Sequence, residues 1–69
     1  MIEVFKTNVL ELRQTEPLLA LLLHSFPGSK VNFDLHDCDK ILRIESAKIC
    51  IEQILDIIRS NGFYCEVLE

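Results

Sequence analysis

Glycine and proline are scarce in this sequence, with two residues of each. That scarcity excludes a collagen-like repeat and a flexible linker, and no glycine-rich loop that could cradle a phosphate is present. The composition, 49% apolar and 26% charged, is instead typical of a globular chain. At 69 residues we expect one domain spanning residues 1–69, with a small core.

Basic residues and long apolar runs are also few. Seven lysines and arginines against eleven acidic residues give a net charge of −4, which argues against nucleic acid as a partner. No apolar run approaches the roughly 18 residues of a membrane span, and the N-terminal stretch is not a basic, apolar signal sequence. We therefore expect no membrane association and a cytoplasmic protein.

The sequence has three cysteines, an odd number in no recognisable framework spacing. This pattern favours a reducing compartment over a disulfide scaffold. Cys50 and Cys65 fall at positions predicted to face inward, and their expected separation along a helix and a strand is too large for a disulfide. Cys38 is the cysteine expected to be exposed.

No catalytic constellation is evident. The carboxylates are dispersed with no spacing that makes an acid and base pair, and no serine, histidine and aspartate arrangement is present. His24 lies near the predicted end of a helix, where an imidazole can interact with the last carbonyls. We predict neither an enzyme nor a bound cofactor.

The segment 46–62 carries the clearest helical pattern. Ser46 is predicted as the N-cap and Gly62 as the residue that ends the helix in a left-handed conformation. Apolar residues recur between them at helical spacing and predict a face that packs on a sheet. These residues are Cys50, Ile51, Ile54, Leu55, Ile57 and Ile58.

A second helix is predicted from Thr15 to about Ser25, with Pro17 in its first turn. Its leucines cover more than one face, which predicts a core helix with some exposure toward a partner. A membrane-surface helix is the alternative, but that class needs basic residues on the polar face, where this segment has Gln14, Glu16 and His24.

Four strands are predicted from period-two alternation, at 2–9, 31–35, 41–45 and 63–68, with a polar turn at 36–40. The first strand alternates in two phases, and we favour the phase that buries Phe5, Thr7 and Val9. The other strands are predicted to direct alternate apolar residues inward. These are Val31, Phe33, Leu35, Leu42, Ile44, Phe63, Cys65 and Val67.

The predicted order is strand, helix, strand, strand, helix, strand. The right-handed crossover rule leaves few ways to assemble these pieces, and we predict an α+β ferredoxin-like βαββαβ sandwich. In this fold a four-stranded antiparallel sheet carries two helices on one face.

Residues 26–35 (FPGSKVNFDL), 41–46 (ILRIES) and 54–63 (ILDIIRSNGF) resemble the heavy-metal-associated domain of copper chaperones and metal-transporting ATPases. That family has a turn leading into a V-x-V-x-L strand and a late I-x-x-x-I-x-x-x-G-[FY] segment. The resemblance implies Cu(I) or Zn(II) binding through a CxxC motif after the first strand. Without a gap, those cysteines align with Leu12 and Thr15, which cannot supply thiolates. We therefore predict a degenerate member without metal at Leu12 and Thr15.

Three functional hypotheses remain open. The first is a non-catalytic interaction domain that associates with itself through an apolar outer sheet face comprising Ile2, Val4, Ile41, Tyr64 and Leu68. The second is a copper or zinc carrier or sensor with a relocated site at Cys38 and His36, although the flanking aspartates disfavour the thiolate. The plain alternative for that segment is a polar turn, and a redox cysteine is another.

The third hypothesis is a small-molecule regulatory domain of the ACT type, although that class usually has a glycine in the first strand–helix loop and residues 10–14 contain none. An RNA-recognition domain has the same element order but stacks bases on aromatic residues of its central strands. Residues 41–45 contain no aromatic side chain, so we exclude that class.

Overall fold

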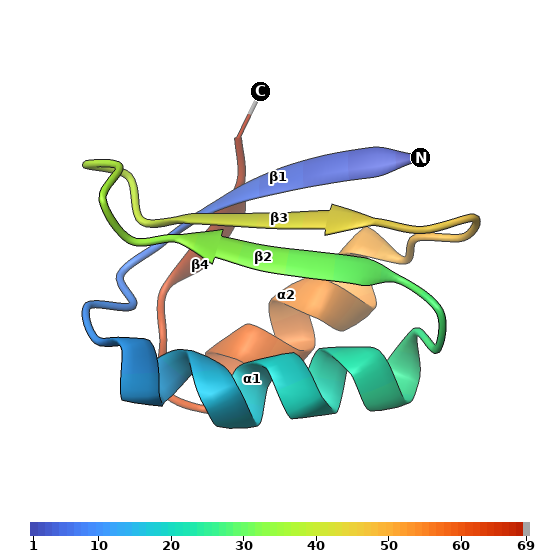
Figure 1. Cartoon of the computed structure of the whole chain (residues 1–69), viewed down its shortest axis with the longest axis horizontal. Coiled ribbons are helices and arrows are strands. Elements are labelled where there is room, and N and C mark those ends of the chain that lie inside the picture. Colours follow the sequence, from blue (N-terminus) through green and yellow to red (C-terminus); the bar gives the residue numbers. More distant parts are fainter. Residues whose placement is uncertain (69) are drawn as a thin grey trace.

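Two helices cover one face of a four-stranded antiparallel sheet (Figure 1). The computed structural model describes residues 1–68. The sheet order is β2-β3-β1-β4, and the element order confirms the predicted α+β ferredoxin-like fold. The elements are β1 (Ile2–Thr7), α1 (Leu12–Ser25), β2 (Lys30–Asp34), β3 (Ile41–Glu45), α2 (Ile51–Ser60) and β4 (Cys65–Val67).

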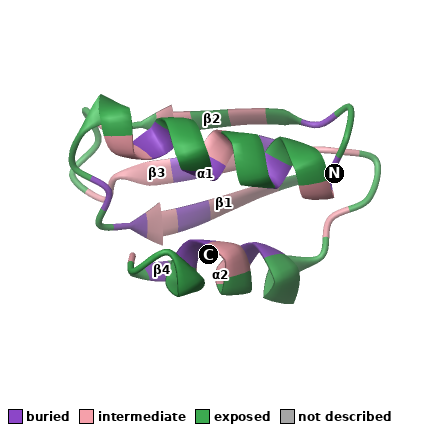
Figure 2. Ribbon diagram, turned by 90° about the horizontal axis from the view of Figure 1, so that it is seen from below, coloured by how far each residue is buried: buried purple, intermediate pink, exposed green. Residues whose placement is uncertain are grey.

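The core lies between the sheet and the helices, and every element contributes to it. α1 lies on the β2 side of the sheet and α2 on the β4 side (Figure 2). The strands β2 and β4 contribute less than the central pair because they form the edges of the sheet. The buried apolar residues are Phe5, Val9, Leu18, Leu22, Phe26, Leu42, Ile44, Ile54, Ile58 and Cys65.

The orientation of β1 is the one favoured from the sequence. Phe5, Thr7 and Val9 are buried, while Ile2 is exposed on the opposite face. The predicted end at Val9 is wrong, because the strand ends at Thr7. The Thr7 hydroxyl donates to the carbonyl of Lys40 at 2.6 Å and accepts from the N–H of Val9 at 3.2 Å, so the chain turns away from the sheet here.

The start predicted for α1 is wrong. The helix begins at Leu12, ahead of Thr15, and Glu11 is its N-cap. Gln14 explains this start, because its Oε1 accepts from the N–H groups of Leu10 and Glu11 at 3.1 and 3.0 Å. The N–H of the N-cap Glu11 is one of the backbone donors that a helix start leaves without partners, and that of Leu10 directly precedes it. Pro17 consequently lies beyond the first turn.

The start predicted for α2 is also wrong. Ser46 is not the N-cap, because its N–H and carbonyl exchange hydrogen bonds with Met1 and so extend the ladder between β1 and β3. The helix begins at Ile51, with Cys50 as its N-cap. Cys50 is exposed rather than buried in the helix face, so Cys38 is not the only exposed cysteine.

The end of α2 is as predicted, but the last strand is shorter. The helix ends at Ser60, and Gly62 follows with φ +89°, a conformation that favours glycine. β4 comprises Cys65–Val67 rather than 63–68. Its alternation is as expected, with Cys65 buried and Tyr64, Glu66 and Leu68 exposed.

Candidate functional site

The corner between β1 and α1 is where the family resemblance places a metal motif. Leu12 begins α1 and is 74% exposed, whereas Thr15 is buried and its hydroxyl donates to the Leu12 carbonyl at 2.6 Å. The polar groups beside them pair locally, since Arg13 lies 3.2 Å from the carboxylate of Glu11 and Gln14 caps the helix. The two aligned positions thus share the first turns of α1, one as an exposed apolar residue and one as part of the helix packing.

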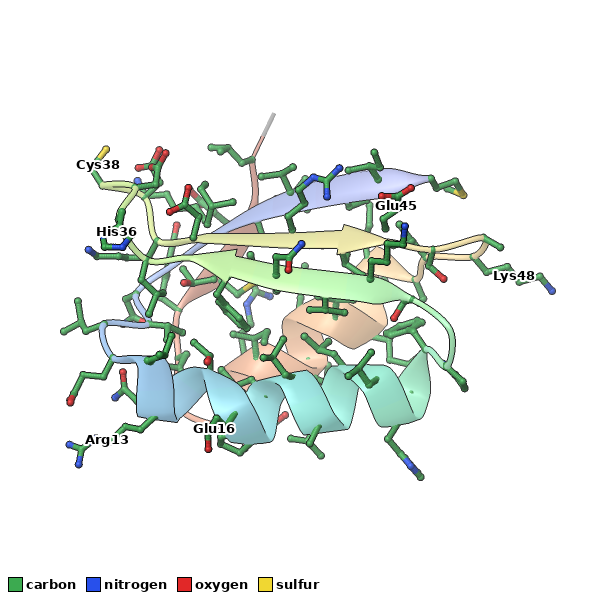
Figure 3. All side chains as sticks on the ribbon, viewed as in Figure 1. Arg13, Glu16, His36, Cys38, Glu45 and Lys48 are labelled. Carbon is green, nitrogen blue, oxygen red and sulfur yellow. The ribbon has the colours of Figure 1, made fainter. Side chains whose placement is uncertain are left out.

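The turn between β2 and β3 contains the second candidate site. One ligand atom each of Asp37, Cys38 and Asp39 lie within 4.8 Å of one another. His36 is not part of this group, and Figure 3 shows its ring and the Cys38 thiol pointing in different directions. The structure therefore groups Cys38 with its flanking aspartates rather than with His36.

The carboxylates of this turn already have partners. Asp37 accepts from the N–H of Asp39 at 2.8 Å, and Asp39 lies 3.6 Å from the ammonium of Lys6. Lys40 adopts a left-handed φ of 48°, and its ammonium donates to the Leu35 carbonyl at 2.9 Å. These contacts shape a polar turn and join it to the end of β1.

The three cysteines occupy different environments, and none forms a disulfide. Cys38 and Cys50 are exposed, and Cys65 is fully buried. Burial raises the pKa of the Cys65 thiol to about 11, against the lowering influence of Arg59. Cys65 therefore behaves as a small apolar side chain at neutral pH.

The outer face of the sheet is less apolar than the sequence pattern predicts. Each of three apolar side chains has a charged residue directly opposite it on the neighbouring strand. These pairs are Ile2 with Glu45, Val4 with Arg43, and Ile41 with Lys6. This face is therefore mixed, with charged residues among the apolar ones.

The two edges of the sheet differ in how their backbone is satisfied. At the β4 edge, the guanidinium of Arg59 donates twice to the carbonyl of Cys65, from Nε at 3.1 Å and from Nη2 at 2.8 Å. This strand is also only three residues long. Short length and a capped carbonyl are two devices that keep an edge from pairing with other chains.

The β2 edge is longer, and within residues 1–68 no side chain caps a carbonyl of Lys30–Asp34, although Lys40 caps that of Leu35 just beyond it. Met1 and Ser46 exchange both backbone hydrogen bonds, and in an antiparallel ladder such pairs alternate with pairs that make none. In the register of β1 with β3, the bonded pairs are therefore Glu3 with Ile44 and Phe5 with Leu42. The residues of β3 between these pairs direct their backbone groups toward β2.

The same alternation continues into β2. Lys30, Asn32 and Asp34 form hydrogen-bonded pairs with the β3 residues whose backbone groups point toward β2. These residues are Glu45, Arg43 and Ile41. The N–H and carbonyl groups of Val31 and Phe33 consequently point out of the open edge. Within residues 1–68, no side chain donates to or accepts from these four groups. The β2 edge thus offers two donors and two acceptors to another strand.

A stripe of leucines lies beside this edge. Leu12, Leu19 and Leu23 occupy one flank of α1, which we term the leucine stripe, and Glu16 shares this flank. Figure 3 shows Glu16 on the β2 side of α1, away from α2. Leu12 and Leu23 are 74% and 44% exposed, and Leu19 is half-buried. An open strand edge and an apolar helix flank thus occur side by side.

The sequence indicates only part of this candidate site. The excess of leucine in 18–23 predicts that α1 exposes some of its leucines, and Leu21 and Leu23 are exposed, but Leu12 of the leucine stripe lies outside that segment. The edge position of β2 depends on the order of strands in the sheet, which the local pattern of residues 30–34 does not contain.

No family model, curated protein or solved structure matches this chain. Neither helix of the described chain has the length and apolar character that a bilayer crossing requires. The class defined by the structure is therefore a small α+β domain of ferredoxin-like fold, with one open sheet edge beside an apolar helix flank.

Proposed function

We propose that this protein is a non-catalytic interaction domain that associates with a second copy of itself. The observation that carries the proposal is the leucine stripe beside the uncapped edge of β2. A strand edge supplies directional backbone hydrogen bonds, and apolar side chains supply the burial that such pairing needs. In this form the domain resembles a metal-chaperone domain that has lost its CxxC motif.

The proposed surface differs from the outer sheet face favoured by the sequence. On that face, each of three apolar residues stands opposite a charged residue, whereas the leucine stripe follows the helical spacing of α1 and has one charged residue, Glu16, on its flank. We propose that this self-association takes place in the cytoplasm. Two exposed cysteines without disulfide partners support this location, because such thiols persist in a reducing compartment.

The mass of the protein in native mass spectrometry, at micromolar concentration and under reducing conditions, tests the proposal. We expect a species of twice the 8.0 kDa chain mass. Observation of the monomer alone across this range would contradict self-association.

A matched pair of variants identifies the surface. Leu21 and Leu23 are 41% and 44% exposed on α1, but they lie on opposite flanks of the helix. Leu23→Glu is expected to weaken the dimer at least about tenfold, because a carboxylate would have to be desolvated in the contact. Leu21→Glu is expected to leave the dimer as stable as that of the wild type. Equal effects of both variants would exclude the leucine stripe as the contact.

The competing hypothesis is the metal carrier with a site around Cys38 and His36. The structure favours it less, since His36 lies outside the cluster and the aspartate carboxylates have partners. Titration of the wild type and of Cys38→Ser with Zn²⁺ and with Cu(I) separates the two hypotheses. Tight binding by the wild type that is lost in Cys38→Ser would support the carrier, and equal binding by both would exclude it.

A further inference from the structure

The charges along β2 are arranged so that the strand is complementary to itself. Lys30 and Asp34 lie at the two ends of the strand, with Asn32 midway between them. All three are exposed and on the outer face, while Val31 and Phe33 lie on the inner face against the core. Within the described residues, neither Lys30 nor Asp34 has an ion-pair partner in the same chain.

We propose that β2 pairs with β2 of a second copy in an antiparallel register centred on Asn32. This inference rests on the proposed self-association and assigns its geometry. In this register Lys30 stands opposite Asp34 of the second copy, and Asp34 opposite its Lys30. Val31 stands opposite Phe33 of the second copy, and the reverse pair is equivalent by two-fold symmetry.

The backbone fits a two-fold axis that passes through a residue, as in this register. An axis between two residues would pair a residue that faces out of the edge with one that bonds to β3. Val31 and Phe33 direct their N–H and carbonyl groups out of the edge, so each pair of Val31 with Phe33 exchanges two hydrogen bonds. The two symmetric pairs use all the free groups of both residues in each copy. Asn32 then falls in a pair without backbone bonds, where the facing Cα atoms approach to about 4.5 Å.

The neighbouring two-fold registers lose the charge match. Centring on Phe33 would place Lys30 opposite His36, and centring on Val31 would place Asp34 opposite Gly28. Charged residues usually protect a strand edge by opposing further pairing. On β2 they match in one two-fold register and are left without a charge partner in its two neighbours, which makes them a device for selecting a specific partner, the second copy of this chain.

The helices beneath the sheet fit the same arrangement. α1 contacts β2 and lies beneath β2 and β3 (Figure 2), so joining two β2 edges brings the two α1 helices about two strand spacings apart, ~10 Å. This separation is close to the 8–10 Å between the axes of packed helices. The helices run antiparallel across the two-fold axis, and each presents its leucine stripe to the other. Leu19 and Leu23 would thereby be buried.

Charge reversal tests the register. Lys30→Asp places two like-charge pairs at the junction, and so does Asp34→Lys, so each is expected to weaken the dimer at least about tenfold. The double variant Lys30→Asp with Asp34→Lys restores two opposite pairs and is expected to recover the wild-type dissociation constant. Asp34 also accepts from the N–H of His36 at 3.2 Å, and Asp34→Lys removes this acceptor together with the charge. Asp34→Asn is the control that keeps the acceptor and removes only the charge.

Cross-linking tests the centre of the register directly. Asn32→Cys, in a background of Cys38→Ser and Cys50→Ser, places two thiols at the two-fold axis within the Cα separation that disulfides require. We expect mild oxidation to yield a covalent dimer. Lys30→Cys in the same background is the matched control, because its thiols lie at opposite ends of the junction and should not form a disulfide.

The outcomes separate the register from self-association itself. A dimeric wild type with unaltered association in both single charge variants, or with equal cross-linking of Asn32→Cys and Lys30→Cys, overturns the register but leaves the dimer standing. A wild type that is monomeric by native mass overturns both. Weakening by each single variant, recovery in the double variant and cross-linking at position 32 alone support the register.

Discussion

Cys65 shows how burial determines the chemistry of a single residue. Its thiol is fully buried between β4 and the helices, and its pKa is raised from 9.0 to about 11 by the loss of solvation. The nearby guanidinium of Arg59 opposes this shift, but burial is the larger influence. A buried thiol with this pKa is protonated at neutral pH and is neither a nucleophile nor a metal ligand.

The raised pKa of Cys65 predicts a loss of stability at alkaline pH. Between about pH 9 and 11 the unfolded chain releases the thiol proton while the folded chain retains it. The free energy of unfolding should therefore fall by about 1.4 kcal/mol per pH unit in this window from this group alone. Urea unfolding of the wild type and of Cys65→Ala at several pH values measures the effect.

The variant Cys65→Ala is expected to be less stable at pH 7, because it removes a buried side chain. Its dependence on pH between 9 and 11 should nevertheless be shallower than that of the wild type. Tyr64→Phe is the companion variant, because the pKa of the exposed Tyr64 is also raised, chiefly by its hydrogen bond with Glu66. Parallel pH profiles for the wild type and Cys65→Ala would refute the assignment to Cys65.

At the scale of elements, side-chain hydrogen bonds to the backbone set where α1 begins. Gln14 accepts from the N–H groups of Leu10 and Glu11 and so satisfies two donors at the helix start. We predict that Gln14→Ala lowers the free energy of unfolding by about 1 kcal/mol, as lost N-terminal caps do. Gln53→Ala, on the exposed surface of α2, is the control, and its change should stay within about 0.5 kcal/mol.

The β4 edge depends on Arg59 in a similar way. Its guanidinium makes two hydrogen bonds to the Cys65 carbonyl. Arg59→Gln is expected to cost about 1–3 kcal/mol of unfolding free energy, because the charged donor is lost and the carbonyl is left without its partner. The control is Arg13→Gln, whose ion pair with Glu11 is on the surface, with a side chain 80% exposed. A larger loss in Arg13→Gln would contradict this ranking.

The strands and the order of elements could be predicted from the sequence because alternation is a local property. Leu42 and Ile44 face inward as the pattern of residues 41–45 predicts, and Gly62 marks the end of α2. The start of α2 could not be predicted in this way, because it depends on a contact distant in sequence, whereas that of α1 depends on the local hydrogen bonds of Gln14. Ser46 pairs with Met1 across the sheet, and no local feature of residues 46–50 indicates that pairing.

At the scale of the whole molecule, the strand order determines which backbone groups remain free. The order β2-β3-β1-β4 makes β2 and β4 the edges. Arg59 caps a carbonyl of β4, whereas within residues 1–68 no side chain bonds to the outward backbone groups of Val31 and Phe33 in β2. Residue types alone indicate the turn between β2 and β3, with Cys38, as a candidate metal site. The open edge of β2 can be recognised only when the order of strands in the sheet is known. Self-association through β2 would extend the sheet of one copy into the sheet of the other.

Amide hydrogen exchange at increasing protein concentration tests this account most directly. The N–H groups of Val31 and Phe33 point out of the edge in one copy and would be hydrogen-bonded in the dimer, whereas that of Asn32 bonds to β3 in both states. We predict that exchange at Val31 and Phe33 slows as the dimer forms, while exchange at Asn32 changes less. Rapid exchange at Val31 and Phe33 under conditions where the measured mass is that of the dimer would contradict the pairing of β2.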